Sequence, residues 1–87
     1  MAYRVEMAPA AQRDLRRLPR EVQARLATPV QALAEDPRPV GVRQLQVEEW
    51  TWRIRVGPCR VVYDILDDQA LVVVLKIARR SDATYRR

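Results

Sequence analysis

The hydrophobic pattern changes its period in the middle of the chain, at the proline-rich segment EDPRPVG (35–41). Before this segment, apolar residues recur at spacings of three and four, which is typical of amphipathic helices. After it, apolar and polar residues alternate, which is typical of strands with one buried face. Helices followed by a run of strands predict an α+β fold, in which a helical hairpin packs on one face of a small sheet.

The N-terminal part predicts one strand and two helices. AYRVEM (2–7) alternates and predicts a short strand, after which a first helix runs to about Leu18. Pro19 opens a second helix. Pro29 lies inside that helix and lacks an N–H, so we expect a kink, or a break after which Thr28 caps a restarted helix. The expected buried stripes are Ala8, Ala11, Leu15 and Leu18 in the first helix and Val22, Leu26, Val30 and Leu33 in the second.

The C-terminal part predicts a run of strands. Its turns, Gly57-Pro58 and Asp67-Asp68-Gln69, are short, so consecutive strands are expected to pair in antiparallel fashion. The predicted order is therefore a strand, two helices and three or four further strands in a mainly antiparallel sheet. The expected strands are a short one at 42–45 and longer ones at 50–56, 59–66 and 70–79.

Length and composition limit the class of protein. The chain has 87 residues, which predicts a single domain (1–87). It has one cysteine, which excludes a disulfide framework and fits a reducing compartment. It shows neither the apolar core of a signal peptide nor an apolar run long enough to span a membrane. We therefore expect a cytoplasmic protein without a membrane partner.

Positive charge is concentrated in the C-terminal part. The net charge is +5, and residues 53–87 carry eight Arg or Lys against four Asp, whereas residues 1–52 carry eight Arg against seven Asp or Glu. An uneven basic surface indicates a polyanionic partner, most simply nucleic acid. The alternative interpretation is a charge that only keeps the protein soluble.

Strand alternation predicts that the arginines share the face that the helices leave open. In 50–56 the expected core residues are Trp50, Trp52, Ile54 and Val56, and in 59–66 they are Val61, Tyr63 and Ile65. In 70–79 we expect Leu71, Val73, Leu75 and Ile77 in the core, and Val72, Val74, Lys76, Ala78 and Arg80 outside it. The open face would then carry one acid, Asp64, among the cations Arg53, Arg55, Arg60, Lys76 and Arg80. Such a surface is typical of phosphate binding.

The stretch WRIRVGPCRVVYDILDDQALVVVLKIARRSDATY (52–85) resembles the C-terminal half of RelE-type toxins, which belong to the RelE/ParE superfamily of bacterial toxin–antitoxin modules. The shared order is a basic W-R-I-R strand, G-x-x-R-V-V-Y, an acidic turn, an apolar strand, and an Arg followed by a Tyr. The segments YRVEMAPAAQRDLRRLP and QALAEDPRPVGVRQL resemble the opening strand, the helices and the following turn of the same family.

The resemblance implies a toxin that cleaves mRNA in the ribosomal A site and so inhibits translation. It implies the ribosome with its mRNA as one partner and a small cognate antitoxin as the other, with operator DNA contacted only through the antitoxin. It implies no cofactor. Two alternatives stay open: a ParE-like inhibitor of DNA gyrase on the same fold, and an inactive protein that only binds its antitoxin and acts as a co-repressor.

The resemblance also assigns residues to the expected site. The predicted catalytic residues are Arg55, Arg60, Arg80 and Tyr85. The predicted RNA phosphate-binding residues are Arg53 and, from strand alternation rather than from the resemblance, Lys76. The best-known ribosome-dependent relatives have lysines at the positions of Arg53 and Arg55. Arginine practically cannot release its proton, so Arg55 is a poor general base. Either the base lies elsewhere or this protein is slower or different.

The expected chemistry needs neither histidine nor metal. RNA supplies its own nucleophile, the 2′-hydroxyl beside each phosphate. The chain contains no histidine, and its sequence shows no cluster of residues at metal-ligand spacing. We therefore expect a metal-independent endoribonuclease in which positioned positive charge supplies most of the rate enhancement.

Overall fold

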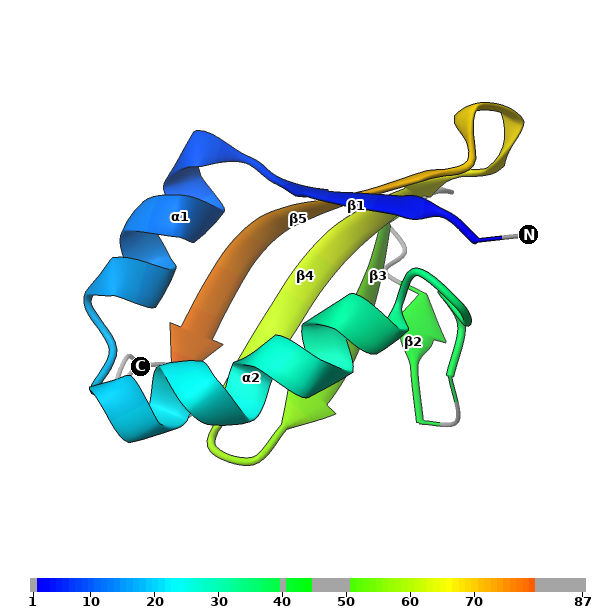
Figure 1. Cartoon of the computed structure of the whole chain (residues 1–87). Helices are drawn as coiled ribbons and strands as arrows, with labels where there is room; N and C mark the ends of the chain where they lie inside the picture. Colours follow the sequence, from blue (N-terminus) through cyan, green and yellow to red (C-terminus); the bar gives the residue numbers. More distant parts are fainter. Residues whose placement is uncertain (1, 40, 45–50, 80–87) are drawn as a thin grey trace.

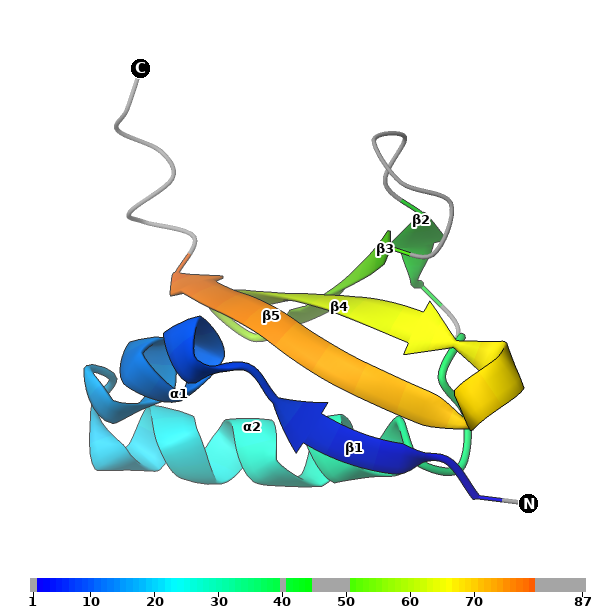
Figure 2. The same ribbon diagram turned by 90° about the horizontal axis from the view of Figure 1, so that it is seen from above.

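The computed structural model describes residues 2–39, 41–44 and 51–79. Within them, two helices pack on one face of a five-stranded sheet (Figures 1 and 2), so the predicted α+β fold is confirmed. The strand order is β1-β5-β4-β3-β2, and every neighbouring pair is antiparallel except β1 with β5. The elements are β1 (Arg4–Met7), α1 (Pro9–Arg16), α2 (Arg20–Ala32), β2 (Arg43–Gln44), β3 (Thr51–Val56), β4 (Cys59–Leu66), the short 3-10 helix η1 (Asp67–Gln69) and β5 (Leu71–Arg79).

The first strand and helix both complete the edge of the sheet along β5. β1 pairs with β5 in parallel, and after β1 ends the N–H of Ala8 donates to the carbonyl of Val74 at 2.8 Å. Further along, the N–H of Ile77 donates to Oδ2 of Asp14 on α1 at 3.0 Å. A helix side chain thus takes the place of a strand partner for the last part of β5, which anchors α1 at that end of the sheet.

α2 is one continuous helix from Arg20 to Ala32, so the predicted break at Pro29 and restart at Thr28 are wrong. Pro29 lies in the last turn, where a lost hydrogen bond disturbs little of the helix. The bond that Pro29 cannot make would go to the carbonyl of Arg25. Because Arg25 is exposed, water can solvate that carbonyl instead.

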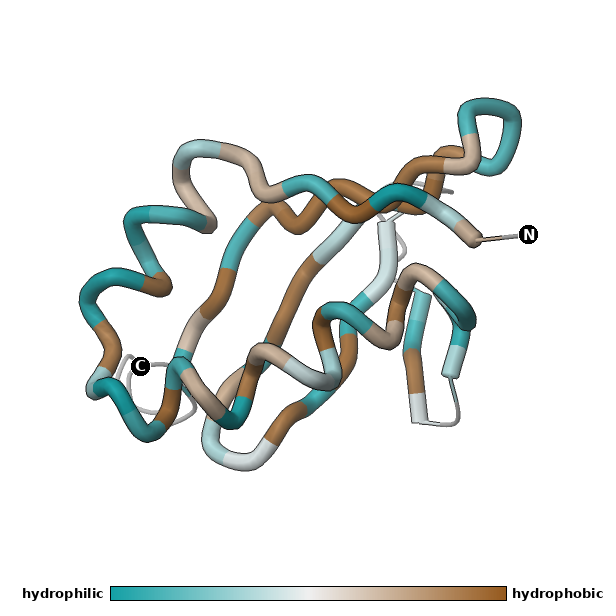
Figure 3. The backbone as a smooth tube through the Cα atoms, in the orientation of Figure 1, coloured by the Kyte–Doolittle hydropathy of each residue, from teal (hydrophilic) through white to brown (hydrophobic). Residues whose placement is uncertain are grey.

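The core lies between the helices and the sheet, and both predicted helical stripes contribute to it. Ala11 is 0% exposed, and Leu26 and Leu33 are nearly as buried. They pack with Val61 and Tyr63 of β4. In Figure 3 the brown, hydrophobic segments gather along β4 and β5. Over the described residues, no helix is both long and apolar enough to cross a bilayer.

The predicted faces of β5 are right in the second half of the strand and wrong in the first. Ile77 is buried and Lys76 is exposed, as predicted. Before them the pattern is reversed, because the fully buried residues are Val72 and Val74 and the half-buried ones are Leu71, Val73 and Leu75.

A β-bulge causes this reversal. Val62 pairs with Lys76, but the next residue, Tyr63, pairs with Val74, so Leu75 is an extra residue in β5. One extra residue shifts the alternation of side chains by one and exchanges the two faces of the strand. Alternation read along a single strand cannot reveal such a residue.

Candidate functional site

The β3–β4 hairpin holds Arg53, Arg55 and Arg60 on the face of the sheet opposite to the helices. Arg55 pairs directly with Arg60, and directly opposed residues project to the same side of a sheet. The other side of β4 carries the residues buried under the helices, Cys59, Val61, Tyr63 and Ile65. Figure 2 shows both helices on that one side. The structure thus brings the three arginines together on the uncovered face.

Lys76 joins the arginines from the neighbouring strand β5. It pairs with Val62, which in turn pairs with Arg53, so the three residues form one row across β5, β4 and β3. The pair Arg55 and Arg60 forms the adjacent row. We call the four cations Arg53, Arg55, Arg60 and Lys76 the basic face.

None of the four cations of the basic face forms a salt bridge with a described carboxylate. Arg55 and Lys76 are exposed, and Arg53 and Arg60 are half-buried. Across 2–39, 41–44 and 51–79, the two salt bridges join Arg4 to Glu6 and Arg38 to Asp67, and neither involves the basic face. Like charges directly opposite each other destabilise a sheet. Guanidinium groups match phosphate oxygens in bidentate geometry, so an oxyanion would relieve this repulsion.

Arg43 extends this surface, although the sequence analysis did not single it out. It lies on β2, is exposed, and pairs directly with Arg53. Gly41, Arg43, Arg53 and Arg55 line a pocket of about 280 Å³ at this edge of the sheet. The signal in the sequence was a basic residue in the predicted short strand, but only the register of β2 against β3 reveals its neighbours.

Two carboxylates share the uncovered face, which corrects the expectation of Asp64 alone. Asp64 accepts a hydrogen bond from Oγ1 of the buried Thr51 at 2.7 Å. Glu6 of β1 lies opposite Val73 in the same row and is bonded to Arg4 at 3.1 Å. In the described part of the chain, no three His, Cys, Asp or Glu residues gather in a way that could hold a metal ion.

The predicted residues Arg80 and Tyr85 lie outside the described residues, as does Trp50. The last described residue of β5, Arg79, pairs with the buried Cys59 and so faces the helices. Its Nε atom is buried and has no hydrogen-bond partner among the described residues. Arg79 therefore does not belong to the basic face.

A second polar cluster fastens the segment before β2 to the turn before β5. Arg38 forms two hydrogen bonds to the carboxylate of Asp67, at 3.0 and 3.4 Å, and the Tyr3 hydroxyl donates to the same carboxylate at 2.6 Å. These hydrogen bonds lower the pKa of Asp67, and the bond from Arg38 has the larger effect. Arg38 also lies 5.1 Å from the centre of the Trp52 ring, a cation–π contact. Each group has a partner inside the fold, so the cluster is structural.

Tyr63 is part of the core rather than a proton acceptor. Its hydroxyl donates to the carbonyl of Pro37 at 2.7 Å, and burial raises its pKa to about 12. At neutral pH the phenol is therefore neutral.

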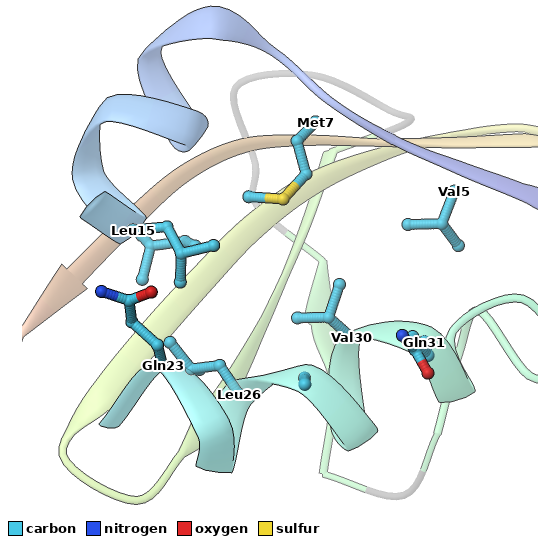
Figure 4. Close-up of a pocket in the computed structure, with 9 residues that line it drawn as sticks. Val5, Met7, Leu15, Gln23, Leu26, Val30 and Gln31 are labelled. Atoms are coloured by element: carbon cyan, nitrogen blue, oxygen red, sulfur yellow. The ribbon is translucent and has the colours of Figure 1, made fainter. Parts of the chain in front are cut away.

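Another pocket is apolar and lies on the helix side of the sheet (Figure 4). It has a volume of about 300 Å³. Val5 and Met7 enter it from β1, and Leu26 and Val30 from α2. None of its described lining residues is ionisable, so these residues offer no acid–base or phosphate-binding group.

The comparison with known families matches residues 5–84 to the model described as "ParE toxin of type II toxin-antitoxin system, parDE". The chain belongs to the RelE/ParE family of type II toxins. Among curated proteins, this toxin is 33% identical over 88 residues to Toxin RelG of Mycobacterium tuberculosis, with all of each chain covered. It is 28% identical over 86 residues to the putative toxin RelE1 of Methanocaldococcus jannaschii, covering 95% of this chain and 96% of the relative.

Solved structures give the same result for the fold of the toxin. It matches the toxin–antitoxin complex RelBE2 of Mycobacterium tuberculosis with a TM-score of 0.81 at 29% identity, over 92% of this chain and 100% of the other. It matches the archaeal RelE–RelB complex of Pyrococcus horikoshii with a TM-score of 0.81 at 26% identity, over 92% and 97%. The isolated E. coli RelE toxin, at 22% identity and a TM-score of 0.78, shares the fold over 98% of both chains.

Proposed function

We propose that this toxin is a ribosome-dependent endoribonuclease that cleaves mRNA in the A site. The observation that carries the proposal is the basic face: four cations from three adjacent strands, on the side that the helices leave uncovered, with no salt bridge to a described carboxylate. Such a surface fits the backbone of a single-stranded RNA that approaches the open side of the sheet.

The chemistry follows from where charge develops. The RNA 2′-hydroxyl attacks the adjacent phosphate, and negative charge accumulates on the phosphate oxygens before the 5′-oxygen leaves. Arg60, on β4 between β3 and β5, binds the scissile phosphate and stabilises this charge. Arg53 and Lys76 hold flanking backbone, while Arg55 orients the nucleophile. Arg80 and Tyr85 complete the predicted site from outside the described residues.

The general base is not an arginine, because a guanidinium keeps its proton at any physiological pH. Removing one preorganised donor from such a site typically costs about 10² to 10³ in rate. Loss of Arg60 should therefore abolish detectable activity in cells even though the other cations remain.

We also propose that a small cognate antitoxin binds and neutralises this toxin in the cytoplasm. The relatives of known structure that support this proposal are complexes with their antitoxins, RelBE2 and archaeal RelE–RelB. The family match places this chain among type II toxins, whose antitoxins are proteins.

Inhibition of DNA gyrase is the second candidate function. It is favoured by one observation, namely that the matching family model is that of ParE toxins. We favour RNA over gyrase because four cations on one face, without a salt bridge to a described carboxylate, suit a flexible phosphate chain.

Sequencing of mRNA ends after a brief induction of the toxin separates these functions. Cuts phased with codons within translated regions support the endoribonuclease. If the DNA-damage response is induced while the mRNA stays intact, the function is gyrase inhibition and the endoribonuclease proposal is wrong. If neither effect appears while growth continues, the chain acts only as an antitoxin-binding co-repressor. Arg60→Ala should remove the cuts, and Arg17→Ala, which removes an exposed charge on the helix side, should preserve them.

A further inference from the structure

The basic pocket at the β2–β3 edge includes the β3 arginines of the basic face but not its cations on β4 and β5. Its lining is Gly41, Arg43, Arg53 and Arg55. Neither Arg60 nor Lys76 contributes to it. Arg43 and Lys76 occupy the two ends of one row that crosses β2, β3, β4 and β5. Three strand spacings separate their backbones, about 14 Å, so the two ends of the row can serve different anions.

The local backbone places Arg43 in this pocket. Gly41 has φ +92°, a conformation that other residues rarely adopt, and the Val42 N–H closes the turn by donating to the Pro39 carbonyl at 3.1 Å. β2 follows at once and pairs Arg43 with Arg53. Among the described residues, nothing lies within 4 Å of the Cβ position of Gly41, so the glycine is explained by its backbone geometry.

Three guanidinium groups line the pocket without a described counter-charge. Arg43 and Arg55 are exposed, Arg53 is half-buried, and none takes part in a salt bridge with a described carboxylate. Cross-strand pairs of like charge such as Arg43 and Arg53 are unfavourable. Planar guanidinium forks that converge on one cavity are suited to a phosphate group, which accepts several hydrogen bonds at once.

We propose that Arg43 and Arg53, beside Arg55, form a second phosphate subsite, which binds an RNA backbone phosphate flanking the one held by Arg60. This inference rests on the proposed action on RNA. An RNA strand is favoured over a free phosphate ion because the pocket continues the row of cations that runs to Lys76. A chain of phosphodiesters supplies an anion for each part of this row. Arg43 is the residue specific to the subsite.

The test compares Arg43→Gln with Arg17→Gln, an exposed helix-side arginine whose loss changes the net charge equally. The ligand is a short labelled single-stranded RNA with 2′-O-methyl sugars, which cannot be cleaved. For Arg43→Gln we expect about five- to tenfold weaker binding and a salt dependence of log K reduced by about 0.7. Arg17→Gln should match the wild type. Equal behaviour of the two variants would overturn the subsite.

A scan of single neutral methylphosphonate linkages identifies the source of the phosphate. One linkage position should weaken binding to the wild type but add no further loss in Arg43→Gln. If no position behaves in this way, the RNA subsite is wrong. If inorganic phosphate alone shows the whole difference between the variants, the pocket binds free phosphate and the RNA subsite is also wrong. The RNA subsite is equally wrong if Arg43→Gln weakens binding of the antitoxin while RNA binding is unchanged.

Cleavage in a cell-free translation reaction distinguishes failure of the subsite from failure of the proposed function. If the wild type cuts mRNA, Arg43→Gln should raise the substrate concentration for half-maximal cleavage more than it lowers the maximal rate. Equal cleavage by Arg43→Gln and Arg17→Gln overturns the subsite alone. If the wild type does not cut mRNA, the endoribonuclease proposal falls, and the uncleavable-RNA titration still decides whether Arg43 binds an RNA phosphate.

Discussion

Arg55 and Arg60 are directly opposed across the β3–β4 hairpin, on the face of the sheet that neither helix covers. This pairing of like charges works against the hairpin. Other cross-strand pairs of the same hairpin, such as Ile54 with Val61, are neutral and carry no such repulsion. An anion bound between the two side chains when the toxin acts would offset this repulsion.

Reversing one charge of this pair should separate stability from function. Arg55→Glu gives an opposed Glu and Arg in place of two Arg, so we expect the free energy of unfolding to rise by about 0.2 to 1 kcal/mol. Urea denaturation measures this change. The same variant should lose toxicity, because a carboxylate then lies where phosphate is proposed to bind. Arg55→Gln serves as the neutral control, and a variant with Arg55→Glu that is less stable than this control would contradict the repulsion.

Removing the carboxylate of Asp64, which shares the uncovered face with the basic face, should strengthen RNA binding. Asp64 shares the uncovered face and accepts a bond from Thr51, and an asparagine oxygen can accept the same bond. Asp64→Asn therefore removes repulsion of phosphate while preserving the local structure, and affinity for uncleavable RNA should rise about two- to fivefold. Fluorescence anisotropy at low salt measures it. Weaker binding would instead give Asp64 a direct part in holding the RNA.

Tyr63 should matter for folding and not for activity. Tyr63→Phe removes a buried hydrogen bond and leaves the Pro37 carbonyl without its donor, which should cost about 1 to 3 kcal/mol in unfolding free energy. Tyr3→Phe is the matched control, because its hydroxyl bonds at an exposed position and should cost less. Equal losses in chemical denaturation would be inconsistent with the burial of Tyr63. Growth inhibition by folded Tyr63→Phe should persist.

The Arg38–Asp67 contact should stabilise the fold only while Asp67 is ionised. Because the pKa of Asp67 is lowered in the folded state, its contribution is present above the unfolded pKa and is lost as pH falls through the folded pKa. The difference in unfolding free energy between wild type and Asp67→Asn should be constant above about pH 5 and shrink below about pH 4. A difference that grows towards low pH would contradict the assigned shift. Asp68→Asn, in the same exposed turn, serves as the control that removes an equal charge.

The sequence was sufficient for the order of elements and for the faces of β3 and β4, because regular alternation in a tight hairpin fixes both. Arg53, Arg55 and Arg60 could be placed on this basis. It was not sufficient where the sheet departs from regularity. The extra residue Leu75 exchanges the faces at Val72 and Val74, and no residue type in VVVL marks it.

The pairing register of strands that are distant in sequence also could not be predicted, because the alternation within one strand does not specify its partner. β1 pairs in parallel with β5, which places Glu6 on the uncovered face. Arg43 became a candidate only through its pairing with Arg53. Both relationships depend on packing that is decided by the whole sheet. The roles of Arg80 and Tyr85 stay predictions, since both lie outside the described residues.

The most direct test is to incubate the purified toxin with an mRNA, either free or bound to translating ribosomes, and to measure cleavage of the mRNA. The wild type should cut the message only on the ribosome, at codon-phased positions. Arg60→Ala should lower the rate by about 10² or more, while Arg17→Ala should cut like the wild type. Cleavage at an unchanged rate by Arg60→Ala, or an intact message with the wild type, would contradict a phosphate-binding catalytic role for the basic face.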